Sequence, residues 1–242
     1  MKLDDVSKLH QKKFRRLLGH FLVEGEHLLL ELQKAAGRNP ALLRSRLYVT
    51  REHADWKSPF ETQLITGQQM ARISDTRQPQ GIVAVVPMLP TPPASDRERA
   101  VYLHEVQDPG NLGTILRTLA WFGDLRCLLG PGSVDPYNPK AVRASMGAIF
   151  HVPIETDVAL DSLRGRFARI ACLDMQGEPL HSSDFRTYDC YLFGNEARGL
   201  PHASLDSLGA RSFTVAGCGA IESLNLASVV NMCVYELNRQ GR

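Results

Sequence analysis

The chain has 242 residues, of which 43% are hydrophobic and 22% charged. This mix is typical of a folded globular protein and excludes a disordered chain, collagen and a coiled coil. No apolar run reaches the roughly 18 residues of a membrane-spanning helix, and the five cysteines include no Cys-x-x-Cys pair that would indicate a structural zinc site. The first residues lack a secretion signal, so we expect a cytoplasmic protein with no membrane contact and no metal ion.

Charge is divided unevenly along the chain. The formal net charge is +2, but residues 1–100 hold 16 Lys and Arg against 11 Asp and Glu, whereas residues 101–242 hold 12 against 15. A basic segment is typical of a protein that binds a polyanion such as RNA. It is also typical of a solvated helix face, and the charges alone slightly favour that second interpretation. The positive excess gathers in Lys8, Lys12, Lys13, Arg15 and Arg16.

The first part of the chain alternates short strands with helices and ends at a proline-rich stretch. Residues 87–99 contain four prolines, which remove backbone donors and fix φ, so this stretch is predicted to be an extended linker. Two domains are therefore expected, at residues 1–90 and 100–242. Within the first, hydrophobic periodicity predicts helices at 6–18, 25–36 and 68–73, and strands at 21–23, 47–49 and 81–86.

After the linker, strand-length apolar runs alternate regularly with helical patterns. This alternation predicts an α/β domain with a parallel sheet covered on both faces. The predicted strands are residues 101–106, 126–129, 169–173, 190–193 and 212–215, and the predicted helices are 112–122, 139–146, 159–167 and 223–239.

Ligands of open parallel sheets bind beyond the carboxyl ends of the strands, and residues 107–117 occupy such a position. Asp108-Pro-Gly favours a turn there, and Asn111 suits the N-cap of the following helix. Arg117 then lies six residues further along the same helix. A capped helix with a surface arginine explains the caps, although it does not explain the whole string.

Three further segments after predicted strands have unusual compositions. Lys140 and Arg143 share a helix face that suits a phosphate, although a closely packed helix is an equally good explanation. Residues 192–200 run from a buried strand into a glycine, an acid and an arginine, which indicates a close backbone approach. In residues 216–225, two glycines can line a flat cofactor, while Ser223 or Asn225 can cap the last helix.

Several common chemistries are not indicated. The sequence has no Gly-x-Gly-x-x-Gly after a strand, no phosphate-binding loop with Gly-Lys-Ser/Thr, and no Gly-x-Ser-x-Gly nucleophile turn. The eight histidines show no metal-ligand spacing.

Together, the four segments resemble the catalytic domain of the SpoU/TrmH branch of the SPOUT RNA methyltransferases. The resemblance rests on Asp-Pro-x-Asn-x-Gly-x-x-x-Arg at 108–117, Phe-Gly-Asn-Glu-x-x-Gly-Leu at 193–200, Ser-Leu-Asn at 223–225, and Lys-Ala-Val-Arg-Ala-Ser-x-Gly-Ala-Ile-Phe at 140–150. The first part of the chain resembles, more loosely, the substrate-binding domain often found ahead of it. That likeness is carried by Lys-Lys-Phe-Arg-Arg at 12–16, Phe-Leu-Val-Glu-Gly at 21–25 and Gln-Gly-Ile-Val-Ala at 80–84.

The resemblance implies a small N-terminal α/β RNA-binding domain followed by a SPOUT-type parallel-sheet domain with a C-terminal trefoil knot. It further implies that S-adenosylmethionine binds in the knot and that a homodimer forms with its sites at the interface. The implied activity is transfer of a methyl group to a ribose 2′-hydroxyl of structured RNA, either ribosomal or transfer RNA.

The resemblance also assigns residues. It implies that Arg117 positions an RNA phosphate and helps to activate the 2′-hydroxyl; because arginine stays protonated, we expect it to act as an electrostatic clamp rather than a base. The other polar site positions are Asn111, Glu196, Ser223 and Asn225, and the expected cofactor contacts are Gly194, Val215 and Leu224. The expected RNA-binding residues are Lys12, Lys13, Arg15, Arg16, Lys140 and Arg143.

One departure from the family pattern leaves alternatives open. Residues 215–217 are Val-Ala-Gly, where the family usually has Ile-Pro-Met, and this change is expected to loosen the adenine pocket. An RNA-binding protein with a decayed methyltransferase domain is therefore the main alternative. A third interpretation is methylation of a base nitrogen, although the set of Asn111, Arg117, Glu196 and Asn225 favours ribose.

Overall fold

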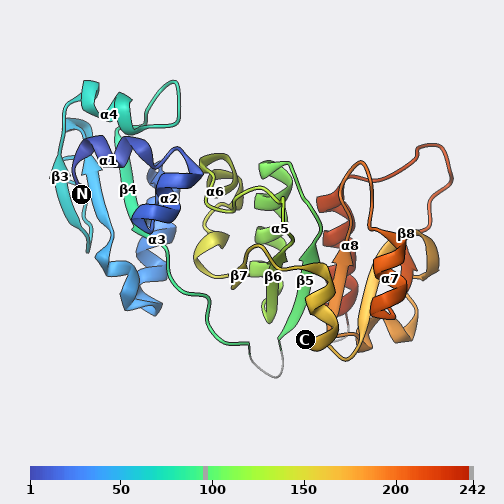
Figure 1. Cartoon of the computed structure of the whole chain (residues 1–242). Coiled ribbons are helices and arrows are strands. Elements are labelled where there is room, and N and C mark those ends of the chain that lie inside the picture. The colour runs from blue at the N-terminus through green and yellow to red at the C-terminus, as the bar shows by residue number, and fades with distance from the viewer. Residues whose placement is uncertain (95–97, 240–242) are drawn as a thin grey trace. The chain divides into compact units, whose positions relative to one another are not determined.

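The structure is a computed structural model that describes residues 1–94 and 98–239, and the chain forms two compact units (Figure 1). The first unit comprises Met1–Pro90 together with Asp135–His151, and the second comprises Thr91–Val134 and the chain from Val152 onward. No helix in the described ranges is long and apolar enough to cross a membrane.

The first unit is built on a four-stranded sheet in the order β1-β4-β2-β3. Its strands pair antiparallel except for β2 and β3, which run parallel. All six residues of β4 are buried, as the apolar run predicted, whereas the polar strand β3 is exposed and was not predicted. The bounds are β1 His20–Glu24, β2 Arg46–Val49, β3 Glu61–Leu64 and β4 Ile82–Pro87.

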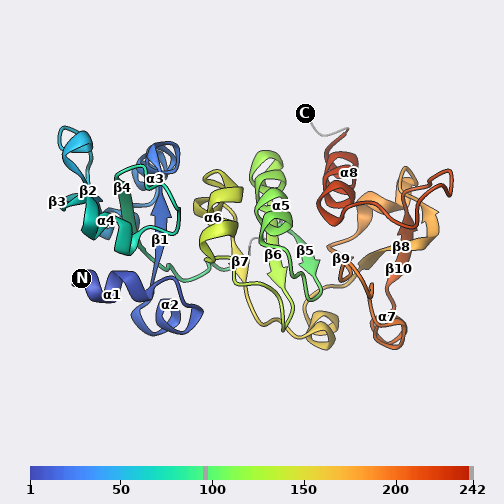
Figure 2. The same cartoon turned by 90° about the horizontal axis from the view of Figure 1, so that it is seen from above.

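Helices cover both sides of this sheet (Figure 2). The α3 helix buries a stripe of leucines and alanines at helical spacing, and α4 begins with a capping box made by Thr66 and Gln69. The bounds are α1 Leu3–Lys8, α2 Lys12–Leu18, α3 Glu26–Arg38 and α4 Gly67–Ile73, with 3-10 turns η1 Pro40–Arg44 and η2 Arg51–His53.

The single helix predicted for residues 6–18 is wrong, because the chain forms α1 and α2 with an interruption between them. Gln11 has an extended backbone, which ends the helical hydrogen-bond pattern. The carbonyl oxygens of Leu9 and His10 at this interruption accept hydrogen bonds from the Arg15 guanidinium, at 2.9 and 2.8 Å. Arg15 therefore satisfies the backbone groups that the break leaves without helical partners.

The first unit also contains a segment from the middle of the sequence, residues 135–151, which the predicted domain boundaries did not include. It carries α6 (Pro139–Ser145) and the turn η3 (Ala148–Phe150), and α6 packs against β1. The Tyr137 ring lies 4.8 Å from that of Phe21. Gly147 has a φ of +94°, and a Cβ there would lie 2.6 Å from the Cβ of Glu31 on α3. Glycine at 147 thus permits close packing of this segment.

The second unit is built on a six-stranded sheet in the order β10-β8-β9-β5-β6-β7. Every pair is parallel, which confirms the predicted parallel α/β fold. The two-residue β7 was not predicted. The bounds are β5 Arg99–Leu103, β6 Leu125–Leu129, β7 Ile154–Glu155, β8 Ile170–Pro179, β9 Cys190–Phe193 and β10 Arg211–Thr214.

Two helical layers enclose this sheet (Figure 2). Ala100 and Tyr102 of β5 belong to a core cluster with η4 and α7, while Val101 and Leu103 point to the opposite face, where α5 and α8 pack together. The helix predicted at 159–167 is a 3-10 turn instead, and α7 was not predicted. The bounds are α5 Pro109–Phe122, η4 Leu160–Gly165, η5 Ser183–Thr187, α7 His202–Leu208 and α8 Leu226–Asn238.

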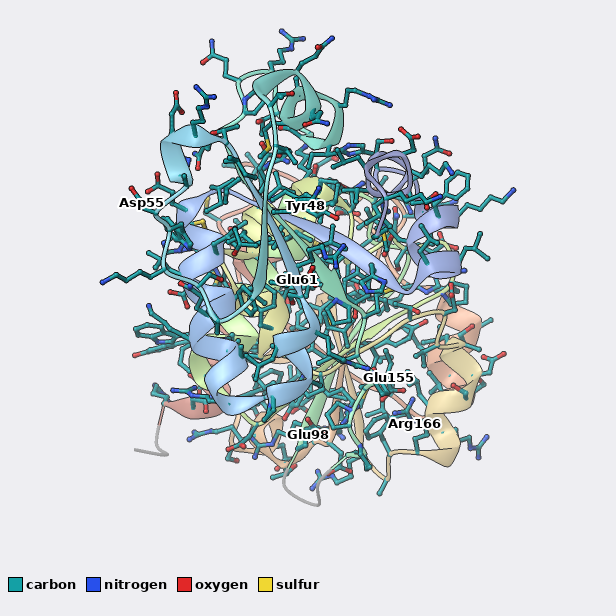
Figure 3. The ribbon with its side chains drawn as sticks, turned by 90° about the vertical axis from the view of Figure 1, so that its left-hand side faces the viewer. Tyr48, Asp55, Glu61, Glu98, Glu155 and Arg166 are labelled. Atoms are coloured by element: carbon teal, nitrogen blue, oxygen red, sulfur yellow. The ribbon has the colours of Figure 1, made fainter. Side chains whose placement is uncertain are left out.

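A buried arginine joins the start of this unit to its sheet. The Arg126 side chain is 4% exposed and donates to Glu98 at 2.9 Å, to Glu155 at 3.1 Å and to the Pro92 carbonyl at 2.8 Å. Arg166 donates to both Glu155 oxygens at 2.9 Å (Figure 3). Burial raises the pKa of Glu155, but the contacts with Arg166 and Arg126 lower it by a larger amount. The pKa of Glu155 therefore lies below its ordinary value.

Candidate functional site

The candidate site lies at the carboxyl edge of the second unit's sheet. The segments that follow β5, β9 and β10 all leave the sheet at this edge, because all the strands are parallel. These segments are residues 104–111, 194–200 and 215–225, so the fold brings together three of the four blocks singled out from the sequence.

Asp108 caps α5. Its carboxylate accepts a hydrogen bond from the Asn111 backbone N–H at 2.7 Å. The prediction that Asn111 caps this helix is therefore wrong; Asn111 lies in the first turn. Because the cap is supplied by Asp108, the Asn111 amide is available for side-chain contacts at the sheet edge.

Asn225 caps α8, and this fixes the direction of a chain of hydrogen bonds. Its Oδ1 accepts from the backbone N–H groups of Ala227 and Ser228, at 2.9 and 3.3 Å. Its Nδ2 then donates to Oδ1 of Asn111 at 2.9 Å, and Nδ2 of Asn111 donates to Oε1 of Glu196 at 3.2 Å. We call Asn225, Asn111 and Glu196 the polar chain; both amides in it donate toward the carboxylate.

Asn195 shapes the turn that presents Glu196, and it was missed from the sequence. Its buried side chain accepts from the backbone N–H groups of Ala197 and Arg198, and donates to the Glu105 carbonyl at 2.8 Å. Arg198 also pairs with the Glu105 carboxylate at 2.5 Å. The available signal was an asparagine directly before the acid in a Gly-containing turn, because asparagine side chains mimic turn backbone.

Arg117 lies on a different face of α5 from the polar chain. Six residues separate it from Asn111, which corresponds to about 120° around a helix of 3.6 residues per turn. Its side chain is exposed and makes no hydrogen bond or ion pair with any residue the structure describes. Trp121, four residues later and on the same side as Arg117, is 79% exposed.

The expected RNA-binding residues belong to the first unit. Those on α2 are Lys12, Lys13 and Arg16, all exposed. The prediction that Arg15 binds RNA is wrong. Arg15 is 2% exposed, and its guanidinium is hydrogen-bonded to Asp135 and to two backbone carbonyls, so it cannot reach a phosphate.

The other two expected RNA-binding residues lie on α6. Lys140 is exposed, whereas Arg143 is half-buried and pairs with Asp75 at 2.8 Å. Both remain on the surface of the unit, in contrast to Arg15.

Comparison with known proteins gives the family. The sequence model of the SpoU rRNA Methylase family matches residues 98–235, and that of the MRM3-like substrate binding domain matches residues 2–84. This chain belongs to the SpoU rRNA methylase family. It is 31% identical to the Bacillus subtilis protein named 23S rRNA (guanosine(2553)-2′-O)-methyltransferase RlmP, an alignment that covers 98% of this chain and 95% of the relative.

Solved structures of similar fold agree with this membership. A TrmH-family RNA methyltransferase from Porphyromonas gingivalis is 27% identical, with a TM-score of 0.84 over 99% of this chain and 97% of the other. An AdoMet-bound rRNA methyltransferase from Sinorhizobium meliloti is 25% identical, with a TM-score of 0.83 over 99% and 95%. The SpoU membership suggested by the sequence motifs is confirmed.

The segment after β10 has the properties of a cofactor loop in this SpoU-family protein. Residues 216–224 are exposed, and none of them makes a hydrogen bond to another part of the described chain. Ile221 and Leu224 expose large apolar side chains beside these unused backbone groups. Apolar surface with nearby backbone donors and acceptors fits an adenine ring and its polar edge, so the residues present fit S-adenosylmethionine.

Gly194, on the neighbouring loop, is required by its own turn. A Cβ at this position would lie 2.4 Å from the carbonyl carbon of Gly199. The glycine allows the chain to fold back on itself between Asn195 and Gly199, which form a backbone bridge.

Proposed function

We propose that this SpoU-family protein transfers a methyl group from S-adenosylmethionine to a ribose 2′-hydroxyl in structured RNA, with ribosomal RNA as the favoured substrate. The polar chain is the observation that carries the proposal, because it gathers three of the polar positions assigned from the family motifs at one sheet edge. The relative from B. subtilis, named for 2′-O-methylation of 23S ribosomal RNA, supports the choice of ribose and of ribosomal RNA. The relatives and solved structures named as methyltransferases give no support to the alternative of a decayed, purely RNA-binding protein.

The cofactor supplies an electrophilic methyl group on a sulfonium. We assign its binding to Gly194, Val215 and Leu224, with residues 216–224 offering backbone groups to the adenine. The Val-Ala-Gly segment at 215–217 keeps these backbone groups although it lacks the family's proline and methionine.

Arg117 and the polar chain have separate tasks in this proposal. Arg117 holds an RNA phosphate and stabilises the negative charge that develops on the ribose oxygen, since a positive charge positioned there lowers the barrier. The hydroxyl proton passes to that phosphate or to another nearby acceptor, because arginine itself stays protonated. Glu196 accepts a hydrogen bond from the 2′-hydroxyl and orients it, because its Oε2 is not engaged by the polar chain. We assign Ser223, which is exposed two residues before Asn225, to contact with the substrate ribose.

We propose that the protein acts as a homodimer through α5 and α8. Trp121, Met232 and Tyr235 are 79%, 42% and 58% exposed on two helices that pack together, and large apolar side chains left exposed on neighbouring helices can serve as a protein interface. Because Arg117 shares a helix side with Trp121 and not with Asn111, dimerisation through this face lets Arg117 of one subunit serve the polar chain of the other.

Replacing Trp121 and Tyr235 together with glutamate is expected to give a monomer, because the apolar contact that holds the subunits is lost. Analytical ultracentrifugation should then report a mass near 26.9 kDa in place of twice that value for the wild type. The paired control Leu43→Glu and Leu64→Glu, which changes exposed leucines outside α5 and α8, should remain dimeric. A dimer that survives the first pair of changes would exclude this face.

Cys218 provides a direct probe of the cofactor loop. All five cysteines are free, and Cys218 alone is exposed; burial raises the pKa of Cys127 to about 12 and raises those of Cys172, Cys190 and Cys233 as well. One thiol per chain should therefore react rapidly with a disulfide reagent, and Cys218→Ser should abolish that reaction.

S-Adenosylhomocysteine at ten times its Kd should slow labelling of Cys218 by about tenfold, in proportion to the free loop. Adenosine monophosphate at the same concentration is the control and should not protect. Equal labelling rates with and without S-adenosylhomocysteine would place the cofactor elsewhere.

The domain assignment and setting complete the proposal. Residues 1–90 form the RNA-substrate-binding domain and residues 100–242 the methyltransferase domain, joined by a linker at about 87–99. We also propose the C-terminal trefoil knot that the family resemblance implies. Free thiols throughout suit the reducing cytoplasm, where we place the activity.

The test is transfer of labelled methyl from S-adenosylmethionine to RNA from cells that lack this gene, followed by digestion to nucleosides. A 2′-O-methyl nucleoside that appears with the wild-type protein supports the proposal. A methylated base would instead establish the third interpretation, and absence of label from total and assembling ribosomal RNA would favour the RNA-binding alternative.

A further inference from the structure

We propose that Arg15 and Asp135 form a clasp that makes α6, with Lys140 and Arg143, part of the RNA-recognition surface of the first unit. The inference rests on the proposed function in taking the polyanion to be RNA. It reassigns residues 135–151, which fall within the stretch matched to the methylase family, from the methyltransferase domain to the RNA-recognition unit.

All three nitrogens of the Arg15 guanidinium make hydrogen bonds. Nε donates to Oδ2 of Asp135 at 2.9 Å, and Nη2 contacts the same oxygen at 2.5 Å. Nη1 donates to the carbonyls of Leu9 and His10. With side chains only 3% and 11% exposed, Arg15 and Asp135 form a buried, charge-assisted pair.

Asp135 also accepts hydrogen bonds from the backbone of the residues that follow it. Its Oδ1 accepts a hydrogen bond from the Tyr137 N–H at 3.1 Å, and its carbonyl accepts from the Asn138 N–H at 3.0 Å. Asn138 in turn caps α6 by accepting from the Lys140 N–H at 2.9 Å. The clasp therefore sets where α6 begins.

The C-terminal part of α6 also contacts other segments of the first unit. Arg143 pairs with Asp75, whose other oxygen lies 3.7 Å from Nδ1 of His10. Asp75 is itself held by Glu24 of β1, which accepts its N–H at 3.0 Å. Arg143 is thus fixed close to His10, just before the basic residues of α2.

These contacts join two basic groups into one surface. Arg143 and Lys140 come from α6, and Lys12, Lys13 and Arg16 come from α2, while Arg15 between them holds the two elements together. An RNA backbone presents a row of phosphates, and cations spread over two helices of one compact unit match a row better than either helix alone. Arg15 is therefore a positioning residue rather than a phosphate ligand.

A double-mutant cycle on the full-length protein tests the clasp. The probe is fluorescein-labelled transcribed 23S ribosomal RNA, with affinity measured by anisotropy over a range of salt. Lys140→Ala with Arg143→Ala should weaken binding about tenfold and reduce the salt slope by roughly 2, because two phosphate contacts are lost. In an Arg15→Met background, the same two changes should weaken binding by less than about twofold, because α6 is already displaced.

Arg16→Met is the matched control, an exposed arginine on the same helix. Its effect should add to that of the Lys140 and Arg143 changes, because the Arg15–Asp135 contacts stay intact in this variant. Asp135→Asn, which keeps the size of the side chain, replaces Arg15→Met if the latter fails to fold. Hydrogen exchange of residues 135–151 should speed up in either clasp variant, and the Kd for S-adenosylmethionine should stay within about twofold of wild type.

Full additivity of the Arg15 and α6 changes, or unchanged hydrogen exchange in residues 135–151, would overturn the inference. Failure of the proposed function would give a different result. If the wild-type protein binds the RNA and the Arg15 and α6 changes are non-additive, yet no RNA is methylated, the clasp stands and the proposed methyltransferase activity does not. A wild-type protein that does not bind the RNA would overturn the recognition surface.

Discussion

Arg117→Ala is expected to lower the rate of methyl transfer by about 10²–10³-fold, the loss typical of removing one positioned charge that stabilises a developing oxyanion. The Kd for S-adenosylmethionine should change by less than about twofold, because the cofactor residues we assign lie after β9 and β10 and not on α5. Single-turnover methylation of ribosomal RNA and calorimetry of cofactor binding measure the two quantities.

The matched control is Arg164→Ala, another exposed arginine of the second unit, which donates to the Ser207 carbonyl. It should retain wild-type turnover. Unchanged turnover in Arg117→Ala would remove Arg117 from the mechanism.

Mixing inactive subunits also tests whether Arg117 acts across the dimer. Co-expressed Arg117→Ala and Asn225→Ala subunits should regain part of the activity, since a mixed dimer contains one site in which both residues are intact. No recovery in a purified mixed dimer would place Arg117 and the polar chain in the same subunit's site.

Arg126→Ala is expected to lower the free energy of unfolding by about 3–5 kcal/mol, the cost of breaking a buried ion pair by removing one partner. Glu98 is left almost buried without its cation, and the Pro92 carbonyl loses its donor. Urea unfolding followed by circular dichroism measures the change, with the slope of the transition checked for two-state behaviour.

Arg166→Ala is the control for this change. It also removes contacts to Glu155, but from a more exposed side chain, so we expect a loss of only about 0.2–1 kcal/mol. Equal losses in the two variants would contradict the special role of the buried arginine.

Acid should weaken the same cluster in the wild type. The folded-state pKa of Glu155 lies below its ordinary value of 4.5, so its contribution to stability is complete above that value and is lost as the pH falls through the folded-state pKa. Arg166→Ala should reduce this dependence, which unfolding curves between neutral and acidic pH will show.

The sequence predicted the parts of the fold that depend on hydrophobic periodicity. Strands such as β4 and β9 are buried along their whole length and could be placed directly. The exposed strand β3 reads Glu-Thr-Gln-Leu and has no apolar alternation to reveal it, because it is held by backbone pairing to β2. The break between α1 and α2 depends on Arg15 contacting backbone far from its own turn, which local periodicity does not encode.

For the candidate site, the sequence motifs identified the residues, whereas the hydrogen bonds that these residues make with one another could be seen only in the fold. Asn111, Glu196 and Asn225 were selected from the sequence, yet their order in one hydrogen-bond chain depends on Asn225 being a helix cap. Asn195 escaped notice because its role is to hold a turn. Arg15 was misplaced because a count of charges does not distinguish a solvated arginine from a buried one.

Residues 135–151 have a consequence for how such proteins can be recombined. A chimera that exchanges only residues 1–90 would place a foreign sheet against this chain's Tyr137 and Gly147, which are fitted to Phe21 and Glu31. The unit that has to be exchanged is therefore discontinuous in the sequence. Its two stretches are separated by the 44 residues from Thr91 to Val134 and must be transplanted together. Modularity in this protein follows three-dimensional packing rather than the linear boundary at the prolines.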